Sequence, residues 1–124
     1  MKIIWSFTAE KDLDAIRTYY LQFSDRTAAR ICGNILATSD KLLNFPLAGR
    51  QEPKLGPGIR ALVADAYYTL IYELSNDIIY IHAVWDVRQR HHKAHRFPQG
   101  KHRLKRYGHE VSASLSGRNL RAYQ

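Results

Sequence analysis

Cysteine is almost missing from this chain of 124 residues, which holds a single one, Cys32. One thiol cannot close an internal disulfide or supply a cysteine-based metal cage, so a disulfide-stapled secreted scaffold is excluded and a reducing compartment is favoured. Apolar runs long enough to span a bilayer are missing too, and the apolar start meets acidic, helix-like sequence too early for a signal peptide. We therefore expect a cytoplasmic protein without a membrane partner.

Acidic residues are scarce in one part of the chain. The whole sequence has 19 Lys and Arg against 11 Asp and Glu, a net charge of +8, but residues 93–124 hold eight of the cations and one of the acids. A near-neutral body with a basic extension favours an accessory contact to an acidic partner over a dedicated nucleic-acid binder. We expect one domain over residues 1–90 and a basic, weakly structured tail over residues 91–124.

The first half of the domain predicts a strand and two helices. Residues 2–5 are mostly β-branched or aromatic, as in a short strand. Apolar residues then recur every three or four positions in two stretches, with Thr8 and Asp25 as the expected N-caps and Pro46 as the end of the second. Because only a few residues separate the two stretches, the helices should form an antiparallel hairpin.

The second half of the domain predicts a small sheet. Residues 46–58 are rich in proline and glycine and predict a loop. Three strand-like runs follow at residues 59–64, 67–74 and 78–85, and the short breaks between them indicate a three-stranded antiparallel meander. Alternation in the middle run places its more apolar face toward the helices. The fold class is therefore α+β, with two helices on one face of an antiparallel sheet.

Several stretches, in this order, resemble one known family. TAEKDLDAI at residues 8–16 is similar to the start of that family's first helix, and LNFPLAGR at 43–50 to its helix end and loop. Arg60, Tyr72 and then AVWDVRQ at 83–89 are similar to its strand set. The family is the RelE/ParE toxin superfamily, and the last stretch is typical of its ParE branch. The resemblance covers roughly residues 2–90 and carries nothing onto the tail.

The resemblance implies a toxin of a type II toxin–antitoxin system, which a cognate antitoxin neutralises in an oligomeric complex. The ParE branch poisons DNA gyrase without known chemistry of its own, whereas the RelE branch cleaves mRNA on the ribosome. We interpret this chain as a ParE-like inhibitor of DNA gyrase, because few proton-transfer groups accompany its arginines. The alternatives are a RelE-like endoribonuclease that acts on mRNA at the ribosome, and an inactive member that acts only as a binding module.

Cations are available for either activity. We expect Arg60 and Arg88 to converge at one end of the sheet, joined by Arg50 or Lys54 from the loop. Cleavage of RNA through its 2′-hydroxyl also needs a group that transfers protons, and His82 in mid-strand is the main candidate. Catalytic residues thus stay unassigned, with candidates Arg60, Arg88 and His82. Five residues are also candidate contacts for the target or the antitoxin: Arg50, Lys54, Arg60, Trp85 and Arg88.

Structural roles compete with these functional ones. A strand histidine such as His82 is more often hydrogen-bonded and half-buried, and the sheet arginines can simply pair with surface carboxylates. Four tyrosines could stack on bases, but their alternation favours packing: Tyr67, Tyr68, Tyr72 and Tyr80. The tail histidines His91, His92 and His95 have no matching ligand spacing, so we expect neither a metal site nor a cofactor.

Overall fold

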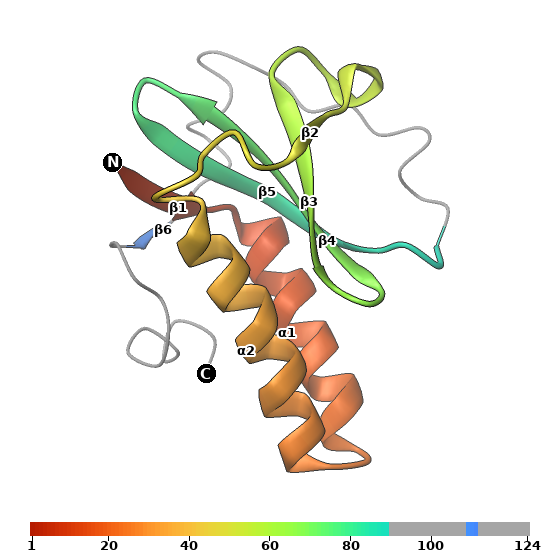
Figure 1. Ribbon diagram of the computed structural model, residues 1–124. Helices are drawn as coiled ribbons and strands as arrows, with labels where there is room; N and C mark the ends of the chain where they lie inside the picture. The colour runs from red at the N-terminus through yellow and green to blue at the C-terminus, as the bar shows by residue number, and fades with distance from the viewer. Residues whose placement is uncertain (90–108, 112–124) are drawn as a thin grey trace.

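A helical hairpin and a sheet make up the fold (Figure 1). The computed structural model describes residues 1–89 and 109–111. The elements follow the expected order, with a short strand, a 3₁₀ turn and a final strand added: β1 (Lys2–Trp5), α1 (Phe7–Leu21), α2 (Asp25–Lys41), β2 (Arg50–Gln51), η1 (Pro53–Leu55), β3 (Ile59–Asp65), β4 (Tyr68–Ser75), β5 (Ile78–Asp86) and β6 (His109–Val111). Both helices lie on one side of the sheet, so the predicted α+β class is confirmed.

The described strands form one sheet in the order β2-β3-β4-β5-β1-β6. Strands β3, β4 and β5 pair antiparallel, which confirms the predicted meander. Strand β1 runs parallel to β5 but pairs only with Ile78–Ile81, because the chain turns into α1 directly after Trp5. The second half of β5 therefore lies beside α1 instead of beside β1.

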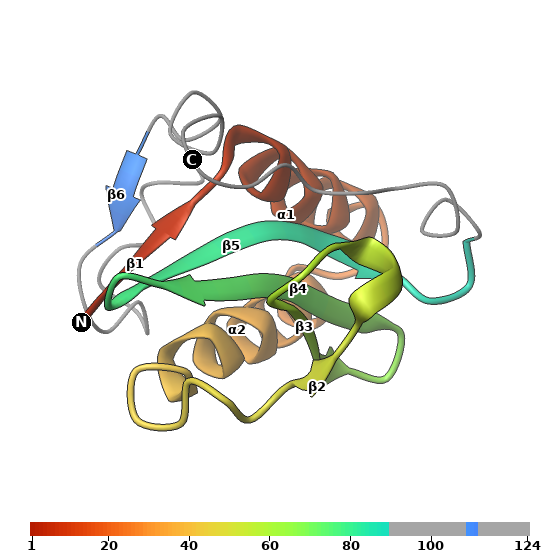
Figure 2. The ribbon, with the colours of Figure 1, turned by 90° about the horizontal axis from the view of Figure 1, so that it is seen from above.

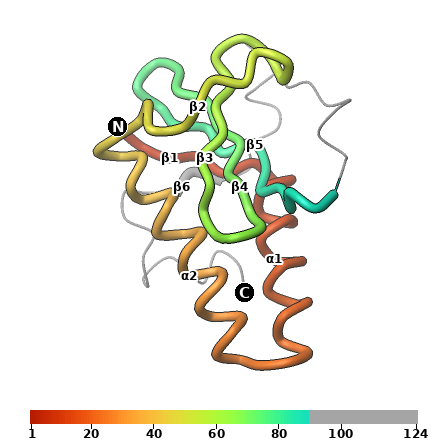
Figure 3. The backbone as a smooth tube through the Cα atoms, turned by 45° about the vertical axis from the view of Figure 1, so that its right-hand side comes forward, coloured from red at the N-terminus to blue at the C-terminus, as the bar shows by residue number. Residues whose placement is uncertain are grey.

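The helices begin slightly earlier than the sequence predicts. The predicted N-caps Thr8 and Asp25 are wrong, since Ser6 and Ser24 cap α1 and α2. Each serine has an extended backbone, and its side-chain oxygen accepts the backbone N–H three residues further on. This arrangement satisfies one of the free donors of the first turn. The helices then run side by side away from the sheet to a tight turn (Figure 3).

Alternation along the strands divides the core in two. Ile79, Ile81 and Leu70 point toward the helices and pack with apolar residues such as Leu13 and Ile35, all 0–1% exposed. The opposite face carries a smaller cluster, made of Leu55, Ile59, Ala61, Ile71, Ala83 and Trp85. The predicted orientation of the middle strand is thus confirmed, and a second apolar face stays available outside the helix layer.

The segment predicted as a loop contains two short elements. Strand β2 pairs with β3 and leads into η1, and the two lie on the near side of the sheet with the helices behind it (Figure 2). A pure loop over residues 46–58 was therefore too simple a prediction. Two strand residues are too few to show a period of two, so the pattern could not reveal β2.

The start of this segment is fixed by a buried tyrosine. The Tyr72 hydroxyl donates to the Pro46 carbonyl at 2.9 Å and accepts the Gly49 N–H at 2.8 Å. Arg60 Nη1 donates to the Gly49 carbonyl at 2.8 Å. A Cβ atom on Gly49 would come within 2.8 Å of the Ala61 carbonyl and of the Tyr72 ring. Glycine is required here because two backbone segments and a ring approach each other closely.

Among the described residues, the predicted tail contributes β6, which pairs antiparallel with β1. The rest of residues 91–124, with the basic clusters, lies outside the described residues, so the domain boundary at residue 90 stays a prediction. Within residues 1–89 and 109–111, no helix is long and apolar enough to cross a membrane.

Candidate functional site

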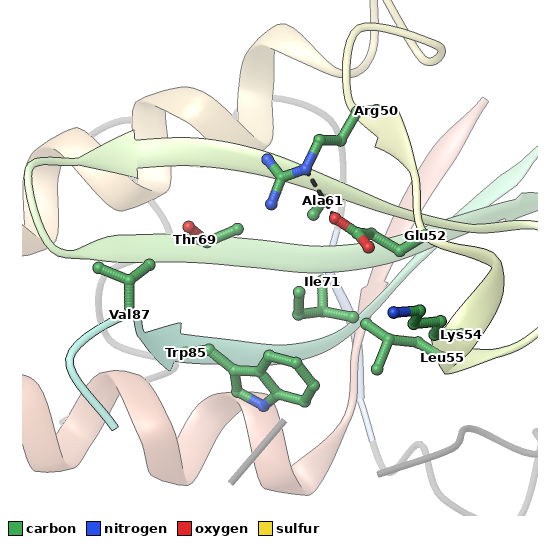
Figure 4. A pocket seen from close by; sticks show the side chains of 9 residues that line it. All are labelled: Arg50, Glu52, Lys54, Leu55, Ala61, Thr69, Ile71, Trp85 and Val87. Atoms are coloured by element: carbon green, nitrogen blue, oxygen red, sulfur yellow. Dashed lines mark hydrogen bonds and ion pairs between the residues drawn. The ribbon is translucent and has the colours of Figure 1, made fainter. Parts of the chain in front are cut away.

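The sheet face turned away from the helices holds a groove of about 630 Å³, which we call the sheet-face groove (Figure 4). Strands β3, β4 and β5 form its floor, and β2 and η1 form one wall. Trp85, 8% exposed, lies in the floor and leaves part of its indole in contact with the groove. The lining residues are Arg50, Glu52, Lys54, Leu55, Ala61, Thr69, Ile71, Trp85 and Val87.

The charged residues of this groove lie on its rim. Arg50 Nε contacts Glu52 Oε2 at 2.6 Å, so these two charges largely balance each other. Lys54 on η1 adds a further positive charge beside the apolar floor. An apolar floor beneath a cationic rim suits an apolar side chain of a partner that also carries acidic groups.

A second hollow of about 650 Å³, the helix-edge groove, lies between α1 and the end of β5. Its lining residues are Thr8, Asp12, Ala15, Ile16, Tyr19, Tyr68, Val84, Trp85, Asp86, Arg88 and Gln89. Asp12 Oδ2 accepts the Val84 N–H at 2.9 Å, a donor that β1 does not reach. Burial raises the pKa of Asp12 to about 6, although the hydrogen bond from Val84 lowers it.

Arg88, which lines the helix-edge groove, is tied to a neighbouring carboxylate. Its Nε and Nη2 donate to the two oxygens of Asp86 at 2.9 and 2.8 Å, and its backbone N–H adds a third bond. The guanidinium carbon lies 4.2 Å from the centre of the Tyr67 ring. The hydrogen bonding of Arg88 to the Asp86 carboxylate is the main cause that raises the pKa of Arg88. Arg88 is thus paired with a surface carboxylate, which is the structural role that we weighed against a functional one.

The expected convergence of Arg60 and Arg88 is wrong. Strands β3 and β5 are both antiparallel to β4, so they run in the same direction. Arg60 lies near the start of β3 and Arg88 lies beyond the end of β5, which places them at opposite ends of the sheet. Arg50 and Lys54 instead line the sheet-face groove, and Trp85 lines both grooves.

His82 lies at an irregular point of β5. Ile71 pairs with Ala83 and Tyr72 pairs with Ile81, so His82 is the extra residue of a bulge. Its Nε2 is 2.8 Å from Glu73 Oε1, and the two residues are 2% and 4% exposed. Neither residue lines either groove. The hydrogen-bonded, buried alternative therefore describes His82 better than a catalytic position does.

The structure also bears on the tyrosines considered for base stacking and on the residues considered for metal binding. Tyr68, Tyr72 and Tyr80 are at most 5% exposed, which confirms packing, whereas Tyr67 is 46% exposed beneath Arg88. In the described part of the chain, no three or more His, Cys, Asp or Glu side chains could hold a metal ion together. The tail histidines His91, His92 and His95 lie outside that part.

Sequence reasoning missed Asp12, although one signal was present. It lies three residues after Ala9 and four before Ile16, so this carboxylate follows the buried stripe of α1. A charged side chain at such a position needs a buried partner. The partner, the Val84 N–H, lies 72 residues away and could not be identified from the helix alone.

Comparison with known proteins identifies the family. The family model of the ParE toxin of the type II toxin–antitoxin system parDE matches residues 3–91. The chain therefore belongs to the toxins of type II toxin–antitoxin systems. More narrowly, it belongs to the ParE toxin family within the RelE/ParE superfamily, as the resemblance implied. Membership implies a cognate antitoxin as partner.

One relative supports this assignment, and one solved structure shares the fold. Toxin RelE2 of Caulobacter vibrioides is 31% identical over 90 residues, which cover 73% of this chain and 93% of the relative. The solved chromosomal ParDE system of P. aeruginosa contains a chain with the same fold, at a TM-score of 0.61 and 24% identity. That match covers 70% of this chain and 96% of the solved chain. Both coverages are consistent with a family domain that leaves part of this chain unmatched.

Proposed function

We propose that this ParE-family toxin inhibits DNA gyrase by binding it, and that the sheet-face groove is the contact surface. On this proposal the protein acts in the cytoplasm, is neutralised by its antitoxin in an oligomeric complex, and needs no cofactor. The observation that carries the proposal is the composition of the groove: an apolar floor around Trp85 and Ile71 with cations at the rim.

The floor can provide a useful part of the binding free energy. Filling the space beside Ile71 and Leu55 with one large apolar side chain would remove roughly 100 Å² of apolar surface from water, worth about 2–3 kcal/mol. Lys54 adds a positive charge to the balanced Arg50–Glu52 pair, and this net positive rim would attract an acidic target surface and raise the rate of association. Such an apolar anchor with a charged rim is the usual composition of a protein contact.

The position of the proton-transfer candidate supports binding over RNA cleavage. An endoribonuclease needs a general base or acid within hydrogen-bond reach of the reacting oxygens. His82 is enclosed with Glu73, and the carboxylate of Glu52 at the groove rim is held by Arg50. The groove thus presents cations and apolar surface, which suit a contact with a protein.

Supercoiling assays with purified gyrase test the proposal. The wild-type chain should inhibit supercoiling or trap cleaved DNA, and it should leave mRNA on translating ribosomes intact. Lys54→Glu and Val87→Glu, both at exposed lining positions, should raise the inhibitory concentration about tenfold or more. Lys11→Glu, an exposed position on α1 outside both grooves, is the matched control and should inhibit like the wild type.

Two outcomes would overturn the proposal. Cuts at defined codons on ribosome-bound mRNA, without any effect on gyrase, would establish the endoribonuclease alternative. Inhibition of gyrase that is equally strong in Lys54→Glu, Val87→Glu and the control would move the contact away from the sheet-face groove.

A further inference from the structure

The helix-edge groove combines an uncovered strand with a carboxylate from a helix. Strand β1 stops pairing at Ile81, so the following residues of β5 face α1. Asp12 of α1 accepts a hydrogen bond from the Val84 N–H at 2.9 Å. A partner strand that tried to extend the sheet here would find this donor already used, and Asp12 would lie in its path. The groove therefore favours recognition of a side chain over addition of a strand.

The charges in this groove leave one acidic group for a partner. Asp86 is engaged by Arg88 through two side-chain hydrogen bonds, so their charges balance. Arg88 also lies against the Tyr67 ring, which fixes the guanidinium at that end of the groove. Asp12 accepts only a neutral backbone N–H, so its negative charge is balanced by no cation that the described part of the chain supplies at hydrogen-bond distance.

Aromatic rings form the other part of the wall. Tyr19 lines the groove, is 51% exposed, and is held edge-on against Tyr20 and Phe23 with ring centres 4.9 and 5.4 Å apart. Tyr68 contributes a second ring, and its hydroxyl donates to the Tyr20 hydroxyl at 3.2 Å. An exposed ring in the same groove as an uncompensated carboxylate offers a cation both charge and contact with a π-face.

We propose that the helix-edge groove binds an arginine side chain of an extended segment of a partner protein, with Asp12 as the acceptor and Tyr19 as the stacking surface. Arginine is favoured over lysine because its planar guanidinium can pair with a carboxylate and stack on a ring at the same time. This groove is separate from the sheet-face groove except for Trp85, and the inference does not depend on gyrase being the target.

The ionisable groups that face the groove make binding depend on pH. They are Asp12 and Tyr19 from α1, Tyr68 from β4, and Asp86 and Arg88 from the end of β5. Because burial raises the pKa of Asp12 to about 6, this carboxylate gains a proton at mildly acidic pH and then no longer attracts a cation. Affinity for arginine should therefore fall as the pH is lowered through 6, and arginine binding should in turn lower the Asp12 pKa.

A peptide titration followed by NMR tests the inference on the full chain. The probe is acetyl-Thr-Val-Arg-Val-Thr-amide, and its counterpart carries citrulline, which has nearly the shape of arginine but no charge. The arginine peptide should shift the Val84 amide and the Asp12 carboxyl carbon saturably at about millimolar concentration, and the citrulline peptide should bind about tenfold more weakly or less. The lysine peptide should fall between the two.

Two variants show whether Asp12 is responsible. Asp12→Asn keeps an oxygen that can accept the Val84 N–H, so the fold should persist while the arginine peptide loses about tenfold or more in affinity. Asp14→Asn, at an exposed carboxylate on the same helix outside the groove, should bind like the wild type. Equal affinity for the arginine and citrulline peptides, unchanged affinity in Asp12→Asn, or no saturable shift would each overturn the inference.

Discussion

Replacing Tyr72 by phenylalanine tests how the start of the sheet-face wall is held. The Tyr72 side chain is fully buried, and its hydroxyl joins the Pro46 carbonyl and the Gly49 N–H, at 2.9 and 2.8 Å. Phenylalanine keeps the ring and its packing, so the change removes these two hydrogen bonds and little else. The loop that leads to β2 would lose its link to the sheet at this point.

The magnitude follows from burial. Leaving a buried donor without its partner costs about 1–3 kcal/mol, so we expect Tyr72→Phe to lower the free energy of unfolding by about 2 kcal/mol. For a folded unit of this size, a loss of 2 kcal/mol corresponds to a fall in Tm of roughly 8–16 °C. The Arg60 bond to the Gly49 carbonyl remains, which should keep the loop close to the sheet in the folded state.

Urea unfolding followed by tryptophan fluorescence measures this effect. Tyr19→Phe is the matched control, because Tyr19 is 51% exposed and its hydroxyl forms no hydrogen bond within the described part of the chain. The control should stay within about 0.5 kcal/mol of the wild type. If Tyr72→Phe is no less stable than Tyr19→Phe, the two bonds do not hold the loop and this reasoning is refuted.

Three further predictions concern single features of the chain. Burial raises the pKa of Asp12 from 3.8 to about 6, so the folded state favours the protonated carboxyl. The contribution of Asp12 to the free energy of unfolding should therefore be highest below pH 3.8 and should fall as the pH rises through 6. Urea midpoints of the wild type should fall over that range relative to those of Asp12→Asn, and parallel curves would contradict this. Thermal unfolding should show that Gly49→Ala is destabilising, because its Cβ would lie within 2.8 Å of Tyr72 and a carbonyl, whereas Gly33→Ala, with no atom within 4 Å, should stabilise α2 by about 0.5–1 kcal/mol. Deleting residues 93–124 should leave unfolding cooperative but reduce both the affinity for an acidic partner and its dependence on salt, and an unchanged salt slope would show that the tail cations make no such contact.

Local patterns were sufficient for most of the fold. The spacing of Leu13 and Ile16 and the alternation around Leu70 reflect burial on one face of an element, which a sequence records directly. The helix starts were predicted one or two residues late, because Ser6 acts as a cap only through the turn that follows β1. Strand β2 escaped prediction because two residues carry no periodicity.

The sites were harder to predict, since they depend on contacts between distant residues. The cations Arg50 and Lys54 were expected in a loop and lie in β2 and η1, and the groove that they border needs the second apolar face around Ile71. The separation of Arg60 from Arg88 does follow from a meander, in which the first and third strands are parallel. The bulge at His82 and its bond to Glu73 depend on register, which the sequence pattern did not reveal.

Growth after induction in a bacterium tests the central claim most directly, because it reports toxicity and the role of the sheet-face groove together. The wild-type chain should arrest growth, and co-expression of its cognate antitoxin should restore it. Lys54→Glu should accumulate to the same soluble level, still bind that antitoxin, and permit growth, whereas Lys11→Glu should arrest growth like the wild type. Normal growth at high soluble expression of the wild-type chain would contradict the toxin assignment, and full arrest by Lys54→Glu would contradict the proposed contact surface.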